Sequence, residues 1–306
     1  RRKPQCDRNE HTSDSGGPYD ICKAQVYDGK SYLSEDVKNQ INSIKLLAGI
    51  LSPFFNSTTK LDKPQEVLGR MHNSGTGGLI SVVIAAAGKG TRMEIGQNKQ
   101  YLEVAGMPVL ARTVRVFEEC SRVDEIVIVA NKDDVAYCIK NIVDRFGFKK
   151  VKSVVAGGET RQQSVFNGLL SVSAGSDLVL IHDGARPFID EAGICSCIDA
   201  AKEFGAACAA VPVKDTIKSG DGMGFVTETL DRSSLWSIQT PQAFLYNRIM
   251  EAHRKAAEER FEATDDASLV EWLGYRVKLV MCSYYNIKIT TKEDLAYAEA
   301  IARLID

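Results

Sequence analysis

The chain has 306 residues, of which 44% are hydrophobic and 25% are charged, and its formal net charge at pH 7 is −2. This length suggests one large domain or two of ordinary size, and the near-neutral charge gives no general electrostatic reason to coat nucleic acid or an anionic membrane surface. The longest apolar stretches, around residues 46–55 and 79–87, are too short to span a bilayer. We therefore expect a globular protein that has neither nucleic acid nor a membrane as its partner.

Residues 1–78 differ from the rest of the chain in composition and in the pattern of their apolar residues. This segment begins with a polar run. Apolar side chains spaced by three or four residues predict one helix over residues 35–51, and a Ser/Gly-rich stretch at 73–78 is typical of a linker. We predict a largely flexible extension over 1–78 and a single domain over 79–306. The first thirty residues contain five acidic side chains and no apolar segment of a secretory signal, so we expect a cytoplasmic protein, with a plastid as the alternative.

From residue 79 onward, short β-branched runs alternate with segments of helical period. Strands are predicted at 81–86, 125–130, 151–155 and 177–182, and helices at 109–120, 133–145 and 161–171. Alternation of this kind indicates a parallel sheet with helices on both faces. The fold class is therefore predicted to be α/β, Rossmann-like, with a mostly parallel sheet.

The last third of the chain predicts further elements of the same domain and one insertion. Strands are expected at 207–213 and 276–281, and helices at 246–260, at 266–272 and from 292 onward. Between them, residues 214–234 contain three glycines flanked by polar segments that favour β-structure. We interpret this stretch as a β-hairpin arm inserted in the α/β domain.

Eight cysteines and four histidines are scattered along the sequence. Only Cys195 and Cys197 are close together, and a C-x-C spacing without a second pair is a poor zinc site. Reduced thiols of a cytosolic type of protein are the simpler expectation.

The most specific motif follows the first predicted strand. Gly88 and Gly90 allow the backbone to approach a phosphate closely, and Arg92 and Lys99 add two cations that can meet its charge. A dinucleotide-binding fingerprint is excluded because Met93 stands where a third small residue is needed, and a Walker A loop is excluded by the order of its residues. The loop is therefore expected to bind phosphate groups at the carboxyl ends of the strands.

From about residue 81 to the end, the sequence resembles the nucleotidyltransferases, and among them the 2-C-methyl-D-erythritol 4-phosphate cytidylyltransferases. The resemblance rests on separated motifs in the family's order, and they are A-A-G-K-G-T-R-M (86–93), K-Q-Y (99–101), G-G-E-T-R-Q-Q-S-V (157–165), H-D-G-A-R-P (182–187), D-T-I-K (215–218), L-D-R (230–232), Q-T-P-Q (239–242), T-D-D-A-S (264–268) and N-I-K-I-T (286–290). The sequence departs from the family at Asn98, where a proline is common, and at Gln163, where an aspartate is common.

The resemblance implies a reaction in which CTP and methylerythritol phosphate give a CDP-alcohol and pyrophosphate, with Mg²⁺ or another divalent cation as cofactor. It implies that Arg92 and Lys99 stabilise the transition state, and that Arg232 and Lys288 orient the acceptor phosphate. The family also implies a homodimer in which the arm enters the partner's site. The four residues Arg92, Lys99, Arg232 and Lys288 are the predicted catalytic set.

The resemblance also implies the substrate contacts. Cytosine is expected against Ala86, Ala87, Gly158, Glu159 and Ser164, with Gly88 and Gly90 at the phosphates. Asp183 is expected near the ribose and the metal, Arg186 as a further anion clamp, and Thr216 at the acceptor. Simpler structural roles stay open for some of these residues. Ser164 could be a polar residue in a first helical turn, and Asp183 and Arg186 could form a structural ion pair. His182 is predicted to be structural.

Three other functions remain alternatives. Ribitol 5-phosphate cytidylyltransferases share the same motifs, but they resemble H-D-G-V-R-P at residues 182–187. Ala185, which stands in the place of that valine, favours methylerythritol phosphate as the acceptor. A regulatory module that binds nucleotide without catalysis is disfavoured because all four predicted catalytic residues are present. Residues 1–78 could instead supply a partner-binding function.

Overall fold

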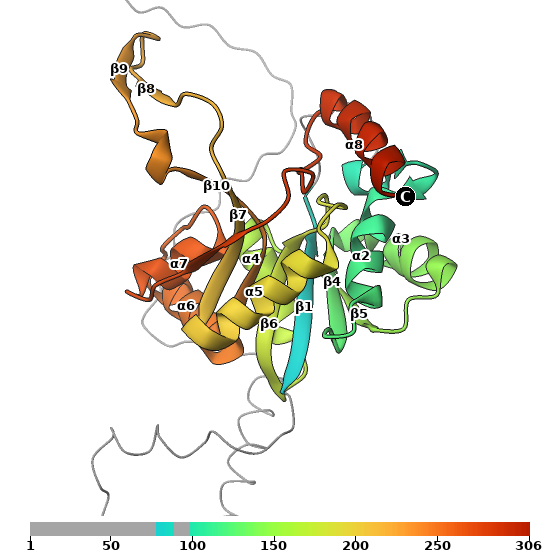
Figure 1. Ribbon diagram of the computed structural model, residues 1–306. Helices are drawn as coiled ribbons and strands as arrows, with labels where there is room; N and C mark the ends of the chain where they lie inside the picture. Colours follow the sequence, from blue (N-terminus) through green and yellow to red (C-terminus); the bar gives the residue numbers. More distant parts are fainter. Residues whose placement is uncertain (1–77, 89–97) are drawn as a thin grey trace, which may run out of the picture. The chain divides into compact units, whose positions relative to one another are not determined.

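The computed structural model describes residues 78–88 and 98–306. The helix predicted over 35–51 and the predicted site residues Gly90 and Arg92 lie outside this described part. Seven strands form the central sheet, in the order β11-β7-β10-β6-β1-β4-β5 (Figure 1). Their bounds are β1 Leu79–Ala86, β4 Glu125–Ala130, β5 Val151–Ala156, β6 Ser176–Asp183, β7 Ala206–Pro212, β10 Trp236–Leu245 and β11 Lys278–Met281.

The sheet is mostly parallel, as predicted. β1 pairs in parallel with β4 and β6, β4 with β5, and β7 with β11, whereas β10 runs antiparallel to both of its neighbours. The register places Ala86 beside Ala130 and Ala85 beside Asp183. The carboxyl ends of β1, β4, β5 and β6 therefore meet at one edge, where open α/β sheets bind their ligands.

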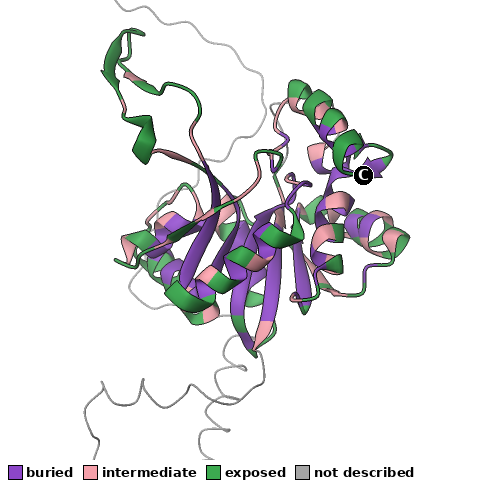
Figure 2. Cartoon of the chain, in the orientation of Figure 1, coloured by how far each residue is buried: buried purple, intermediate pink, exposed green. Residues whose placement is uncertain are grey.

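Helices cover both faces because side chains alternate along each strand. In β1, Val82 and Ile84 contribute to a core shared with α2 (Val109–Glu119) and α5 (Glu191–Phe204). Val83 lies in a second core, on the other face, shared with α4 (Arg161–Leu170), α6 (Tyr246–Glu259) and α7 (Asp266–Trp272). Figure 2 shows the resulting pattern, in which the strands are buried and the outer helix faces are exposed.

Two smaller pairs of strands accompany the sheet. β2 (Glu103–Val104) and β3 (Met107–Pro108) form a short ribbon that shares a small third core with the last helix, α8 (Lys292–Ile305). β8 (Lys218–Gly220) and β9 (Val226–Thr229) form an antiparallel hairpin inside the predicted arm. The arm leaves the body between β7 and β10 and is exposed along most of its length (Figures 1 and 2), so the prediction of an inserted hairpin is confirmed.

Four elements were not predicted, namely the short strands β2 and β3, the helix α5 and the strand β10. α5 fills the interval between β6 and β7, and β10 follows the arm. β10 carries Pro241 within the motif Q-T-P-Q, and a proline in a polar stretch argues against a central strand on sequence grounds. The helix predicted over 133–145 is present but irregular: a 3-10 turn precedes α3 (Val135–Cys138), and a π-helix follows it at Ile139–Asp144.

No helix within residues 78–88 and 98–306 is both long enough and apolar enough to cross a bilayer.

Candidate active site

A cavity of about 800 Å³ opens at the carboxyl ends of the parallel strands. Its walls come from the turns after β1, β4, β5 and β6, from the segment around Lys99, and from the loop before α8. Nine of the predicted site residues line it, namely Ala86, Ala87, Gly88, Lys99, Gly158, Glu159, Ser164, Asp183 and Lys288. Segments that are far apart in the sequence are therefore brought together here, as the motifs predicted.

The turn between β5 and α4 forms one wall of the cavity. Thr160 caps α4 by accepting the N–H of Gln163 at 3.1 Å, and the Gln163 side chain accepts the N–H of Thr160 at 3.4 Å and that of Glu159 at 2.9 Å. This reciprocal capping box satisfies helix N–H groups that would otherwise lack partners. Gln163, a departure from the family pattern, therefore still closes the turn that carries the pocket residues.

Ser164 lines the cavity, but its hydroxyl is already engaged in the turn. Its Oγ accepts the N–H of Gly158 at 3.1 Å and lies 2.8 Å from the carbonyl oxygen of Thr160, to which it donates. Because a hydroxyl has one hydrogen, only acceptor capacity remains for a ligand. The structural alternative for Ser164 is therefore present, and its contact with cytosine stays a prediction.

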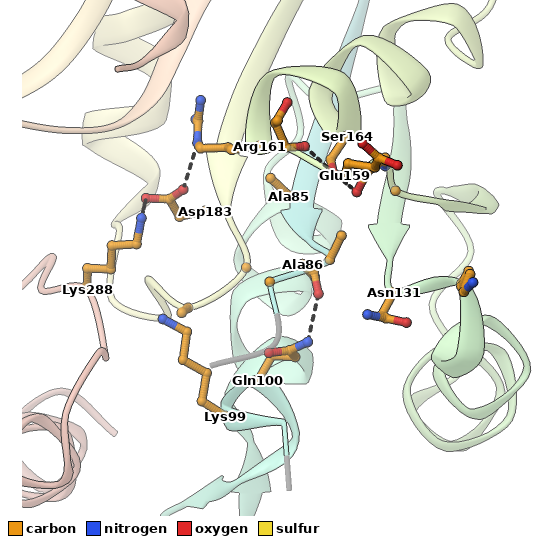
Figure 3. A pocket seen from close by; sticks show the side chains of 18 of the residues that line it. Ala85, Ala86, Lys99, Gln100, Asn131, Glu159, Arg161, Ser164, Asp183 and Lys288 are labelled. Atoms are coloured by element: carbon orange, nitrogen blue, oxygen red, sulfur yellow. Dashed lines mark hydrogen bonds and ion pairs between the residues drawn. The ribbon is translucent and has the colours of Figure 1, made fainter. Parts of the chain in front are cut away.

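Asp183, the last residue of β6, is surrounded by basic groups (Figure 3). Its Oδ2 lies 2.9 Å from Lys288 Nζ and 3.2 Å from Arg186 Nε, and its Oδ1 lies 3.7 Å from Arg161 Nε. Burial alone would raise the pKa of this carboxyl group, but the three positive charges outweigh burial and hold the pKa well below its usual range. Asp183 is therefore a carboxylate at any pH at which the protein works.

Arg186 has the contacts of the structural alternative. Besides Asp183, its guanidinium donates to the carbonyl oxygen of Asn286 at 2.8 Å, and the side chain is 12% exposed. It does not line the cavity in the described part of the chain. In the ligand-free chain these contacts tie the turn after β6 to the loop that carries Lys288, and the role of Arg186 as an anion clamp stays a prediction.

His182 is structural, as predicted. It is fully buried, its Nδ1 lies 3.0 Å from Thr240 Oγ1, and its Nε2 lies 3.0 Å from the carbonyl oxygen of Arg186. Because a carbonyl oxygen only accepts, Nε2 carries the proton and Nδ1 accepts from Thr240, whose oxygen in turn accepts the N–H of Asp183. Burial lowers the pKa of His182 to about 4, so the ring is neutral and holds the Asp183 turn in place.

Lys99 lies on the opposite wall from Arg161, in a 3-10 turn at Lys99–Tyr101 (Figure 3). Its Nζ donates to the carbonyl oxygen of Ile289 at 3.0 Å, one residue beyond Lys288. The adjacent Gln100 is buried and donates to the carbonyl oxygen of Ala86 at 2.7 Å. Both contacts orient the segment so that the ammonium group of Lys99 faces the cavity.

The arm residues Thr216 and Arg232 do not reach this cavity in the single chain. Both are exposed, and Arg232 Nη1 donates to the carbonyl oxygen of Lys214 within the arm itself at 2.9 Å. The arm also exposes large apolar side chains: Met223 is 82% exposed, and Phe225 is 66% exposed. The predicted acceptor contacts of Thr216 and Arg232 are therefore not formed within one copy.

Sequence reasoning left several cavity residues without a role, and Arg161 is the most informative of them. It lies at the first position of α4, between Asp183 and Asp266, and its Nη2 is 2.7 Å from Asp266 Oδ2. A basic residue in the first turn opposes the helix dipole, and this is the signal in G-G-E-T-R that could have revealed it. Gln100 and Asn131 also line the cavity.

Three carboxylates line the cavity, those of Asp133, Glu159 and Asp183, and Asp183 is the one that its basic neighbours hold firmly in the ionised form. Among the described residues, the side chains close enough to share an ion are Cys120, Glu191 and Cys195, whose ligand atoms lie within 4.8 Å of one another, and none of them lines the cavity. Cys195 thus neighbours Cys120, a pairing that the C-x-C spacing does not reveal. The residues at the cavity therefore fit a metal that is held mainly by ligand oxygens.

Residues 80–304 match the 2-C-methyl-D-erythritol 4-phosphate cytidylyltransferase family. The chain belongs to that family. The family member of Halalkalibacterium halodurans is 52% identical over 221 residues, which cover 72% of this chain and 96% of the relative. That of Pelotomaculum thermopropionicum is 49% identical over 224 residues, which cover 73% and 94%.

Solved structures of family members have the same fold. The 4-diphosphocytidyl-2C-methyl-D-erythritol synthase of Anaerococcus prevotii superposes with a TM-score of 0.66 at 38% identity, covering 74% of this chain and 96% of that one. The 2-C-methyl-D-erythritol 4-phosphate cytidylyltransferase of Thermus thermophilus gives a TM-score of 0.60 at 33% identity, covering 74% and 99%. As a member of the cytidylyltransferase family, the chain is a nucleotidyltransferase.

Proposed function

We propose that the chain transfers the cytidylyl group of CTP to 2-C-methyl-D-erythritol 4-phosphate, giving CDP-methylerythritol and pyrophosphate for isoprenoid precursor synthesis. The observation that carries the proposal is the convergence of Lys99, Asp183 and Lys288 on a cavity with a glycine-containing turn. The names of the relatives at about 50% identity support the same substrates.

The chemistry requires positioning and charge neutralisation rather than a covalent intermediate. A phosphate oxygen of the acceptor attacks the α-phosphorus of CTP, and the bond from that phosphorus to the bridging oxygen breaks. Pyrophosphate then leaves with the electron pair. Lys99, together with Arg92 outside the described part, would stabilise the charge that develops on the phosphoryl oxygens. Lys288 would reduce the repulsion between the two anions that must meet.

The walls of the cavity suit a pyrimidine nucleotide. Ala86 and Ala87 leave a shallow apolar surface, and Gly157 is tightly packed, since a Cβ there would lie 2.4 Å from Ala87 Cβ and 2.8 Å from Ser164 Oγ. We propose that cytosine lies against this surface, with backbone groups of Gly158 and Glu159 at its polar edge and Asp183 near the ribose. We expect this surface to favour the smaller pyrimidine ring over a purine.

We further propose a divalent cation, Mg²⁺ or an equivalent, as cofactor. Asp183 would hold it together with oxygens of the triphosphate, and the low pKa of this carboxyl group keeps it in the ligating form. When bound, the ion would neutralise the phosphate charge.

The arm supports a homodimer. A two-stranded hairpin is marginally stable by itself in water, and this one exposes Met223, Phe225 and Val226. We propose that the arm packs on a second copy and delivers Thr216 and Arg232 to the cavity of that copy, where they would contact the acceptor.

Subunit mixing tests this arrangement. Lys99→Ala and Arg232→Ala proteins are each expected to be nearly inactive, but after exchange half of the dimers are mixed, and each of these has one intact site. About a quarter of wild-type activity should then return. If both residues of a site came from one chain, every site would keep a lesion and nothing would return.

The acceptor is tested by comparing rates with methylerythritol phosphate and ribitol 5-phosphate, each with CTP, by pyrophosphate release. Equal or faster turnover of ribitol 5-phosphate would contradict the proposal. The cytoplasm is the compartment we propose, with bacterial relatives as support and a plastid as the alternative; cell fractionation distinguishes the two.

A further inference from the structure

The guanidinium of Arg161 lies between two carboxylates that belong to different parts of the fold. Its Nε is 3.7 Å from Asp183 Oδ1 at the cavity, and its Nη2 is 2.7 Å from Asp266 Oδ2, at the start of α7 (Figure 3 shows the Asp183 side). Asp266 does not line the cavity. It belongs to the motif T-D-D-A-S, for which the proposed reaction supplies no role.

Asp266 is held firmly behind the cavity. Its side chain is 1% exposed, and its Oδ1 lies 3.3 Å from Nε2 of His253, which stacks on Phe166. The Gln242 side chain fixes the backbone here, because its Oε1 accepts the N–H groups of Asp266 and Ala267 at 3.1 and 3.0 Å. Neither oxygen of Asp266 meets a well-aligned donor, so its attraction to Arg161 is mainly coulombic.

This arrangement affects the two oxygens of Asp183 differently. Oδ2 is engaged by Lys288 and Arg186 at 2.9 and 3.2 Å. For Oδ1, the ion-pair contact within the described residues is Arg161 Nε at 3.7 Å, which is too long for a hydrogen bond. Oδ1 is therefore the oxygen that can accept a hydrogen bond from a bound nucleotide or ligate a metal ion.

An arginine beside a carboxylate normally forms a two-pronged contact with both oxygens. Arg161 does not do so with Asp183, because Asp266 holds the far end of its guanidinium. We propose that Asp266 is a positioning residue, which holds Arg161 back from Asp183 and thereby keeps Asp183 Oδ1 accessible to the nucleotide. The proposal rests on the proposed function for its ligand, CTP.

The kinetic test uses Asp266→Asn, which removes the charge and keeps the shape. Arg161 should then close on Asp183, and the KM for CTP should rise about tenfold while kcat changes less than about threefold. The tenfold figure is taken from residues that orient metal ligands, whose loss typically costs about 10–100-fold. In an Arg161→Gln background, the same substitution should change KM less than about twofold, because coupled residues are non-additive.

The matched control is Asp199→Asn, which breaks the 2.7 Å pair of Asp199 with Arg122 on the surface and should leave KM unchanged. An unchanged KM in Asp266→Asn, or an equal rise with and without Arg161, would overturn the proposal. If Asp266→Asn does not fold, Arg161→Lys replaces it: an ammonium group cannot bridge both carboxylates, so KM should rise in the same way, and an unchanged KM would again overturn the proposal.

A crystal structure of ligand-free Asp266→Asn separates this proposal from the proposed function. Arg161 should lie within hydrogen-bond distance of Asp183 Oδ1, and an Arg161 that stays in its present position would refute the positioning role. Failure of the wild-type protein to transfer cytidylyl groups would refute the proposed function and leave this structural result standing.

Discussion

Gly168 in α4 is the point where that helix approaches the sheet most tightly, and Gly168→Ala should destabilise the protein. A Cβ at this position would lie 2.5 Å from Val83 Cγ1 in β1 and 2.7 Å from Val129 Cγ2 in β4. Overpacking of a core costs roughly 1–3 kcal/mol, and the stiff valine side chains favour the upper half of that range. Alanine regains about 1 kcal/mol of helix propensity, which leaves a net loss of about 1–2 kcal/mol.

Equilibrium urea unfolding, followed by the fluorescence of Trp236 and Trp272, measures this loss as a lower midpoint at unchanged slope. The control is Gly175→Ala, where a Cβ would meet nothing within 4 Å, so its midpoint should equal or exceed that of the wild type. A Gly168→Ala protein as stable as Gly175→Ala would refute the argument that close packing requires glycine here.

Three further outcomes are expected. Lys99→Ala should lower kcat by about two orders of magnitude and leave CTP affinity within about tenfold, because a cation directed at developing charge acts mainly in the transition state; loss of CTP binding in calorimetry would make it a ground-state anchor. Chelation with EDTA should abolish turnover and added Mg²⁺ should restore it, and full activity without metal would contradict the cofactor proposal. The pKa of His182 is about 4 in the folded protein, where the ring is buried, and 6.5 is its ordinary value. Between these two pH values only the unfolded chain binds the proton, so the free energy of unfolding falls by up to about 3 kcal/mol as the pH drops from 6.5 to 4. His182→Gln should show a shallower fall in urea midpoint between pH 7 and 4.5, whereas an unchanged fall would assign it to other groups.

The sequence is sufficient to predict six of the seven strands of the sheet, because most of them are short apolar runs that alternate clearly with helical segments. It does not predict β10, because Pro241 and the polar residues around it are typical of a loop. The side-chain hydrogen bonds that satisfy these polar residues form only when the chain has folded. Gln242 shows the reason: it is 1% exposed, and its amide is satisfied by Asp265 and by the N-terminus of α7. A glutamine of this kind looks like a loop residue until its partners are known.

For the site, the motifs predict which residues lie close together but not which contacts each of them makes. Lys288 and Asp183 are assigned by motif, and the structure brings them to 2.9 Å. The contacts formed by Arg186 and the linking position of Arg161 depend on the positions of Asn286 and Asp266, which are 100 and 105 residues further along the chain. Local spacing holds no information about such pairings.

The arm interrupts what is otherwise an ordinary hairpin. β7 and β10 are adjacent antiparallel strands with Pro212 opposite Trp236, and the N–H of Val213 donates to the carbonyl oxygen of Leu235 at 3.1 Å. The chain has therefore already closed the strand pair before the arm begins. Replacing residues 214–234 by a two-residue Asn-Gly turn should give a chain that folds without the arm, so that the folding of the sheet and the assembly of a composite site can be studied as separate events.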